Sequence, residues 1–215
     1  MYSREIEKLK SSLKLTDEQR DVLIGVLLGD AHLETQNGGR TYRVKFEYSA
    51  GHGEYANHLY KIFKEWILTP PQRKQDATHN NVWFQTVSHA AFRFYAHQFY
   101  DEKKKCVPKL IHRFLTARSI AYWFMDDGSI KSRESKGVIF NTQGFERNEV
   151  KRLMTVLRKS FDLEASERKQ KDGLQIYISG KSYKRFREIV DAYIHPSMRY
   201  KIPPERSLVD RKHNA

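Results

Sequence analysis

The 215-residue sequence is poor in cysteine, and Cys106 is the only one. A single cysteine excludes an internal disulfide and a cysteine-rich zinc site, and it fits a reducing intracellular compartment, either an organelle such as the mitochondrion or a prokaryotic cytoplasm. The sequence also lacks any apolar run near the roughly 20 residues that span a bilayer, and its N-terminal segment has no uninterrupted apolar signal core. We therefore expect a soluble protein with no membrane partner.

Acidic residues are also in short supply. The 39 Lys and Arg outnumber the 26 Asp and Glu, which gives a formal net charge of +13, and the excess runs through the whole chain. Such a balance favours a polyanionic partner, although charge alone does not separate DNA, RNA, ribosome or anionic membrane. With 39% hydrophobic residues, the composition is that of a globular protein.

The order of expected elements runs twice along the chain. The first half reads as a helix from Thr16, strands over 32–36 and 40–48, a helix over 54–68, a strand pair within 72–88 and a helix over 89–100. The helix start at Thr16 has the form of a capping box with Gln19, and in the strand over 40–48 apolar residues at 42, 44, 46 and 48 alternate with polar ones. The second half reads as a helix over 116–127, strands over 129–133 and 138–142, a helix over 146–161, a hairpin closed by 171–173 and a helix over 181–194. This repetition predicts an α+β fold of two tandem, pseudo-twofold αββαββα halves, residues 1–108 and 109–215, in one compact monomer.

The opening helix of each half ends in an aspartate. Residues 23–31 and 120–128 are apolar runs that close on Asp30 and Asp127. An anion at a helix C-terminus is unfavourable by about 0.3–1 kcal/mol, and local rules are most often broken at functional sites. One Asp after a helix is typical of an ordinary turn, but two at equivalent positions indicate a site.

The two helices are expected to pack against each other, because the halves need a shared core. Gly25 and Gly29, four residues apart, form a flat stripe that permits close approach. If the helices are parallel, Asp30 and Asp127 emerge side by side and repel each other unless a cation lies between them. Oxygen ligands suit Mg²⁺ (or Mn²⁺), and such metals commonly assist phosphodiester hydrolysis.

Both segments resemble the LAGLIDADG motif of homing endonucleases, and residues 121–128 match it closely. The resemblance extends through 29–31, 41–47, 66–71, 141–143 and 200–203, and is greatest to monomeric, intron-encoded members from yeast mitochondria. It implies two four-stranded antiparallel sheets that form a saddle in the DNA major groove, with the motif helices at the centre. It further implies a metal-dependent, site-specific double-strand break in a long asymmetric DNA target.

The resemblance also implies roles for individual residues. Asp30 and Asp127 would bind the metals, the carbonyls of Gly29 and Asp126 would complete the metal shells, and Lys105 and Lys201 would be the active-site lysines. We rank Lys201 ahead of Lys105, because Lys105 lies in a run of lysines. The side chain of Asp126 is expected to be mainly structural.

The motifs depart from the family pattern in ways that predict asymmetric packing. Ala31 replaces the last glycine of the first motif, and Leu28 and Met125 occupy the first acidic position. Tyr122 and Asp126 stand where small residues are usual, so the glycines of the first helix should receive these larger side chains.

DNA contacts are expected from the polar faces of the strands, because an antiparallel ribbon fits the major groove and presents a polar group at every second residue. The candidates are Arg40, Arg43, Lys45, Glu47, Gln85, Asn141, Gln143, Arg168, Lys169, Gln175 and Tyr177. Two alternatives remain open. One is an intron maturase that binds RNA with the same fold without cutting DNA, and the other is a catalytically silent DNA-binding regulator.

Overall fold

The computed structural model describes residues 3–75 and 80–204. Its strands form two four-stranded antiparallel sheets with matching orders, β1-β2-β4-β3 and β7-β8-β10-β9. The first contains β1 (His32–Glu34), β2 (Arg43–Ser49), β3 (Gln72–Gln75) and β4 (Asn80–Gln85); the second contains β7 (Gly128–Ile130), β8 (Val138–Asn141), β9 (Ala165–Gln170) and β10 (Gly173–Ile178). The expected α+β fold with a repeated sheet is confirmed.

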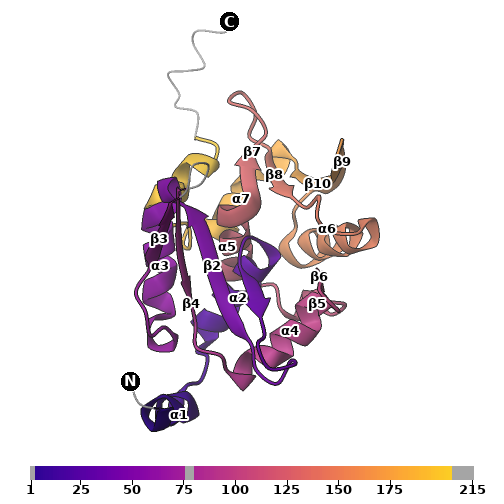
Figure 1. Cartoon of the computed structure of the whole chain (residues 1–215). Coiled ribbons are helices and arrows are strands. Elements are labelled where there is room, and N and C mark those ends of the chain that lie inside the picture. The colour runs from indigo at the N-terminus through magenta and orange to yellow at the C-terminus, as the bar shows by residue number, and fades with distance from the viewer. Residues whose placement is uncertain (1–2, 76–79, 205–215) are drawn as a thin grey trace, which may run out of the picture.

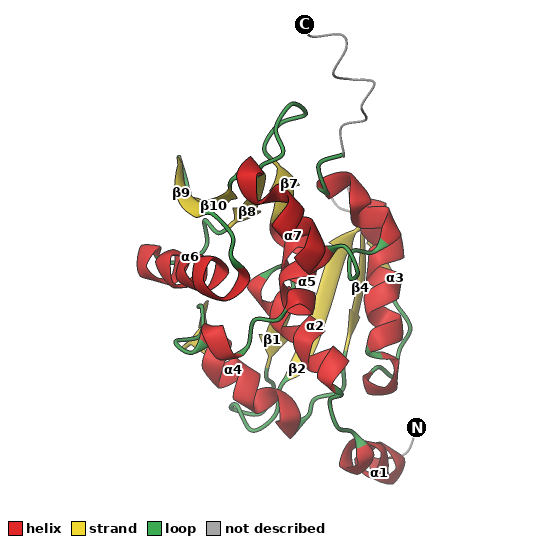
Figure 2. Ribbon diagram, turned by 180° about the vertical axis from the view of Figure 1, so that it is seen from behind, coloured by secondary structure: helices red, strands yellow, loops and turns green. Residues whose placement is uncertain are grey.

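Helices α2 (Asp17–Leu28) and α5 (Ala117–Asp127) lie side by side at the centre (Figure 2). Each begins with a capping box. Thr16 and Gln19 exchange two hydrogen bonds of 3.1 Å at the start of α2, and Thr116 and Ser119 do the same at 3.2 and 2.7 Å at the start of α5. The capping box predicted at Thr16 is therefore confirmed, and the two motif helices start in equivalent ways.

Four further helices pack behind or beside the two sheets. Figure 1 shows both sheets toward the viewer, and Figure 2 shows the helices in front of them from the opposite side. These helices are α3 (Gly53–Ile62), α4 (Arg93–Phe99), α6 (Arg147–Phe161) and α7 (Tyr183–Val190). On the covered face of the first sheet, Phe46 stacks on Phe84 with ring centroids 4.7 Å apart. Val44, Phe46 and Tyr48 are buried as the alternation of β2 predicted.

Several element boundaries differ from the sequence expectations. Strand β2 begins at Arg43 rather than residue 40, because Asn37 accepts a 3.0 Å bond from the Thr41 amide and donates a 2.9 Å bond to its hydroxyl, which holds these residues in a loop. Arg40 consequently lies outside the strand. The helix expected over 54–68 ends at Ile62 and is followed by the short 3-10 turn Lys64–Trp66. The last helix is likewise shorter than 181–194.

Two elements were not expected. Helix α1 (Ser3–Ser12) stands beyond one end of the first sheet (Figure 1). The connector after α4 contains a small hairpin of β5 (Tyr100–Asp101) and β6 (Lys104–Lys105), which presents Lys105 toward the motif helices. Throughout the two described stretches, no helix is long and apolar enough to span a membrane.

Candidate functional site

The contact between α2 and α5 is as close as the glycine stripe predicted. A Cβ added at Gly25 would lie 2.5 Å from the Ser119 carbonyl and 2.8 Å from the Cβ of Tyr122. A Cβ at Gly29 would lie 2.4 Å from the Cβ of Asp126. The glycines of α2 therefore receive the larger side chains of α5, and the interface is asymmetric.

Asp30 and Asp127 lie at the ends of this helix pair in a shared electrostatic environment. Burial, and next the negative charge of Asp30, raises the pKa of Asp127 to about 7. Burial also raises the pKa of Asp30, although the positive charges of Lys201, Lys105 and His52 oppose the change. Loss of hydration thus disfavours both charged carboxylates, and added positive charge would stabilise them.

The Asp126 side chain forms hydrogen bonds with residues of the first half of the molecule. Its Oδ2 accepts a 3.0 Å hydrogen bond from the backbone N–H of Asp30, and its Oδ1 accepts bonds of 3.0 Å from Tyr55 and 3.4 Å from Tyr48. Burial, followed by the charge of Asp30, raises the pKa of Asp126 well above its ordinary value. All three donors engage the carboxylate oxygens, so this side chain joins the two motif ends.

Lys105 and Lys201 each donate to the carbonyl of the residue that precedes a motif aspartate, and to one further carbonyl nearby. The Lys105 ammonium donates to the carbonyls of Gly29 and Ala31 at 2.7 and 2.8 Å. The Lys201 ammonium donates to the carbonyls of Met125 and Asp126 at 2.5 and 2.8 Å. Burial lowers the pKa of both lysines. The geometry gives no reason to rank Lys201 ahead of Lys105.

The second sheet brings further predicted residues to the same place. A cavity of about 260 Å³ is lined by Gly29, Lys105, Asp127, Asn141 and Gln143, among others. Asn141 donates a 2.9 Å hydrogen bond to the carbonyl of Asp127, and its own side-chain oxygen accepts a 2.6 Å bond from Gln175. Asn141 and Gln175, expected as DNA contacts, are therefore engaged with each other and with the motif end.

The outer face of the first sheet carries most of the other predicted residues. Register places Arg43, Lys45 and Glu47 of β2 beside Gln85 of β4 on one face, where a hollow of about 400 Å³ is also lined by Glu34, Lys74 and Trp83. Glu34 pairs with Arg43 at 2.8 Å and lies 3.9 Å from Lys45. The surface thus alternates charges instead of being uniformly basic.

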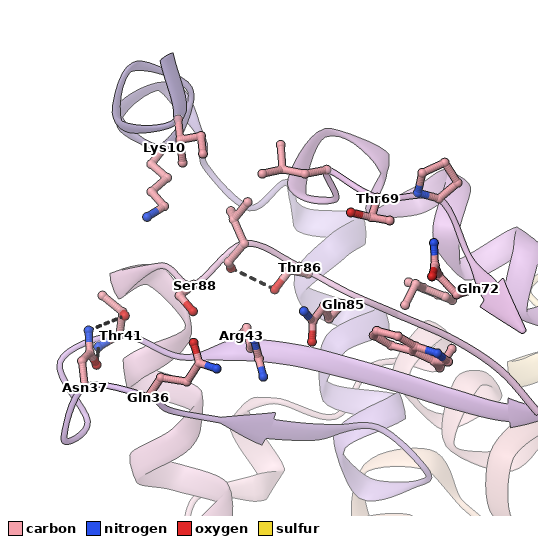
Figure 3. Close-up of a pocket in the computed structure, with 16 residues that line it drawn as sticks. Lys10, Gln36, Asn37, Thr41, Arg43, Thr69, Gln72, Gln85, Thr86 and Ser88 are labelled. Atoms are coloured by element: carbon pink, nitrogen blue, oxygen red, sulfur yellow. Dashed lines mark hydrogen bonds between the residues drawn. The ribbon is translucent and has the colours of Figure 1, made fainter. Parts of the chain in front are cut away.

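A larger hollow of about 550 Å³ continues from this face toward α1 (Figure 3). Arg43, Trp83 and Gln85 line both hollows, so the two are continuous. Lys10, Asn37 and other polar side chains border the far end. None of the lining residues belongs to the motif ends, so this hollow is an extension of the sheet face.

The outer face of the second sheet is defined by register. Arg168 pairs with Gln175, which pairs with Asn141, and Tyr177 alternates with Gln175 on the same face. Lys169 pairs with Leu174, so it belongs to the opposite face. Lys169 therefore does not join the set of residues on this face, contrary to the expectation that placed it beside Arg168.

The donor groups at the motif ends suit a hard divalent cation. They are the carboxylates of Asp30 and Asp127 and the carbonyls of Gly29 and Asp126, and each of the two carbonyls accepts a hydrogen bond from a lysine ammonium. Mg²⁺ and Mn²⁺ prefer such oxygen donors. Within residues 3–75 and 80–204 no three His, Cys, Asp or Glu side chains form a metal cage. A cation here would accordingly need carbonyl as well as carboxylate oxygens.

Sequence reasoning missed several residues of this region. Tyr48 and Tyr55 read as core aromatics, and their hydroxyl contacts with Asp126 carry no local signal. Trp83 and Lys74 lie on the outer face of the first sheet, and the register of β3 and β4 was needed to find them. Glu34 could have been found, since its strand was expected and it precedes a glycine turn.

Comparison with known proteins places the chain among nucleases and their relatives. The profile of the LAGLIDADG DNA endonuclease family matches residues 20–186. The probable intron-encoded endonuclease 1 of Wickerhamomyces canadensis is 34% identical over 198 residues, which cover 87% of this chain and 85% of that protein. The cytochrome b mRNA maturase bI2 of Debaryomyces hansenii is 30% identical over 198 residues, covering 87% of this chain and 74% of that protein.

Solved structures agree with the observed architecture. The homing endonuclease I-WcaI bound to its DNA recognition sequence superposes with a TM-score of 0.89 at 31% identity, covering 95% of this chain and 94% of that one. I-DmoI in complex with DNA and Mn has a TM-score of 0.51 at 12% identity, with 80% and 94% covered, and shares the fold alone. The expected fold class is confirmed.

Proposed function

Since the chain belongs to the LAGLIDADG DNA endonuclease family, we propose that this homing DNA endonuclease acts as a monomer and makes a double-strand break in a long, asymmetric DNA site. Asp30 and Asp127 each serve the hydrolysis of one strand. The observation that carries the proposal is the convergence of both aspartates, with two half-buried lysines beside them, at the end of one helix pair. Residues 1–108 and 109–215 are proposed as its two halves.

The roles of the site residues follow from their chemistry. Asp30 and Asp127, with the carbonyls of Gly29 and Asp126, would hold Mg²⁺ or Mn²⁺. When bound, the metal supplies Lewis-acid activation of water and stabilises charge on the phosphate. The ammonium groups of Lys105 and Lys201 stabilise negative charge that develops on the phosphate oxygens, and their partial burial strengthens this interaction.

The two outer sheet faces provide the DNA-contact surface. Their spacing of polar residues along antiparallel strands suits the major groove. Arg43, Lys45, Glu47 and Gln85 support contacts in one half, and Arg168, Gln175 and Tyr177 in the other. Gln143 follows β8 and lines the cavity at the motif ends, which supports a contact there. Arg40, exposed beside the first sheet, is suited to a phosphate contact, whereas Asn141 is engaged with Asp127.

A second function is supported by the similarity to a cytochrome b mRNA maturase. The chain is as similar to that protein as to several endonucleases, so assistance to intron splicing through RNA binding is the alternative to DNA cleavage. The same similarity favours a mitochondrial setting. Retention of both Asp30 and Asp127 favours cleavage.

The test is cleavage of DNA that spans the intron-lacking insertion site of the host gene, in Mg²⁺. We expect wild type to cut both strands, and Asp30→Asn and Asp127→Asn each to bind the DNA in Ca²⁺ but, in Mg²⁺, to lose cleavage of the strand that the substituted aspartate serves. Asp162→Asn is the matched control, because Asp162 is exposed at the end of α6 in a left-handed conformation that Asn also adopts. Intact duplex with wild type, together with stimulated splicing of the intron RNA, would establish the maturase instead.

A further inference from the structure

The backbone N–H of Asp30 has left the hydrogen-bond ladder of α2. Gly29 donates to the Gly25 carbonyl at 3.1 Å and Ala31 donates to the Val26 carbonyl at 2.9 Å, whereas Asp30 donates to Oδ2 of Asp126 at 3.0 Å. A side chain from the other half of the molecule therefore fixes the backbone of the first motif aspartate.

The Asp126 carboxylate is itself held in place from the first half. Tyr48 on β2 and Tyr55 on α3 both donate to its Oδ1. Their side chains are almost completely buried, with 4% and 0% exposure, so the two hydroxyls have few other positions available. The path from Tyr55 through Asp126 to Asp30 therefore starts from a buried side chain and crosses twice between the two halves of the molecule.

The second motif aspartate has no equivalent support. The motif position that corresponds to Asp126 is Gly29, which has no side chain. Asp127 is held instead at its carbonyl, by Asn141 of β8, and Gln175 of β10 orients Asn141. Two different sets of hydrogen bonds therefore support the two motif aspartates, although their side chains are chemically identical.

The first sheet does not repeat the hydrogen bond by which Asn141 holds the carbonyl of Asp127. His32 and Ser129 each lie two residues after a motif aspartate, and they pair with Lys45 and Ile139, respectively. Lys45 therefore corresponds to Ile139, and Glu47, two residues further along the strand, corresponds to Asn141. Glu47 accepts a 3.0 Å hydrogen bond from Asn81 and pairs with Lys45 at 3.5 Å. Its carboxylate has no N–H with which to hold the Asp30 carbonyl.

We infer that Asp126 is the positioning residue for Asp30, and that Asn141, oriented by Gln175, is the positioning residue for Asp127, so that cleavage of each strand can be slowed separately. This inference rests on the proposed function, in which each aspartate serves one strand. Neither side chain needs to touch DNA, because each acts on the backbone of a motif aspartate.

The test compares Asp126→Ala with Asn141→Ala on DNA labelled separately on each strand. We expect each variant to slow one strand by roughly 10- to 100-fold more than the other, as loss of supporting contacts typically does, and the two variants to affect opposite strands. Asp126→Asn keeps an oxygen for the Asp30 N–H while its amide can donate to the tyrosine hydroxyls, so it should restore the wild-type strand ratio.

A measurement without metal or cleavage makes the test independent of catalysis. In the metal-free protein, hydrogen exchange at the Asp30 amide should accelerate in Asp126→Ala and remain unchanged in Asn141→Ala. If Asp126→Ala does not fold, Tyr55→Phe removes one donor without a large cavity and should shift the strand ratio in the same direction.

Two failures are distinguishable. If both variants slow both strands equally and the Asp30 amide exchanges as in wild type, the positioning roles are wrong although the endonuclease stands. If Asp30→Asn and Asp127→Asn themselves cut DNA at the wild-type rate, the proposed catalytic aspartates are wrong, and the positioning inference is overturned with them.

Discussion

Gly29 lies directly against the carboxyl group of Asp126, so that a methyl group at Gly29 would come within 2.5 Å of Oδ2. The same carboxyl oxygen accepts the Asp30 amide. Gly29 of the first motif thus packs against Asp126 of the second, which is larger than the residue usual at its position. This packing brings the two motif ends into contact.

Gly29→Ala is expected to destabilise the protein. The added methyl group must displace Asp126 or separate the helices, which costs roughly 1–3 kcal/mol for overpacking in a tight core. At about 2–4 °C per kcal/mol for a protein of this size, thermal unfolding should shift down by several degrees. The control is Gly53→Ala, because Gly53 is helical and a Cβ there meets nothing within 4 Å. An unchanged melting temperature for Gly29→Ala would show that the helix contact is looser than described.

The raised pKa of Asp127 predicts that the stability of the protein depends on pH in the absence of divalent metal. Its pKa rises from an ordinary 3.8 to about 7, chiefly by burial, so the folded protein holds this proton more tightly than the unfolded chain does. The resulting stabilisation is fully present below about pH 4 and is lost as the pH rises through about 7. In EDTA, the melting temperature of wild type should therefore fall relative to Asp127→Asn between pH 4 and 8. A difference that stays constant over this range would contradict the raised pKa.

The sequence predicted the features that depend on local chemistry. The capping box at Thr16, the alternation of β2 and the glycine stripe of α2 can each be read from neighbouring residues in the sequence, and the structure contains all three. Contacts between distant residues were not predictable in this way. Tyr55 looks like any core aromatic until α3 is placed against α5, because only the tertiary fold brings its hydroxyl to Asp126.

Which residues of a strand face outward was predictable only where apolar and polar residues alternate. Residues 165–170 contain just one apolar side chain, so nothing in them specifies which residues face outward, and only pairing with β10 separates Arg168 from Lys169. Similarly, the Asn37 side chain delays the start of β2 and leaves Arg40 in a loop, although the local pattern continues the strand.

Arg168 and Lys169 form a matched pair for testing the DNA surface. Both are exposed and basic, but only Arg168 shares a face with Gln175. Arg168→Ala should weaken binding in Ca²⁺ and reduce the dependence of log K on log salt by about 1, as expected for the loss of one phosphate contact. Lys169→Ala should leave both unchanged. Equal losses in the two variants would show that the DNA reaches both faces of β9.

Lys105 and Lys201 are expected to contribute equally to cleavage. Each has a pKa lowered by burial and donates to carbonyls at the end of one motif helix, which places its charge beside an aspartate of the site. Removing one such charge with Lys105→Met or Lys201→Met should slow single-turnover cleavage on the order of 100-fold, while affinity in Ca²⁺ changes little. Lys104→Met is the control, since Lys104 is exposed and its ammonium pairs with Glu146 instead of with a carbonyl of a motif end. A loss confined to Lys201→Met would mean that the matching geometry of the two lysines does not carry over to catalysis.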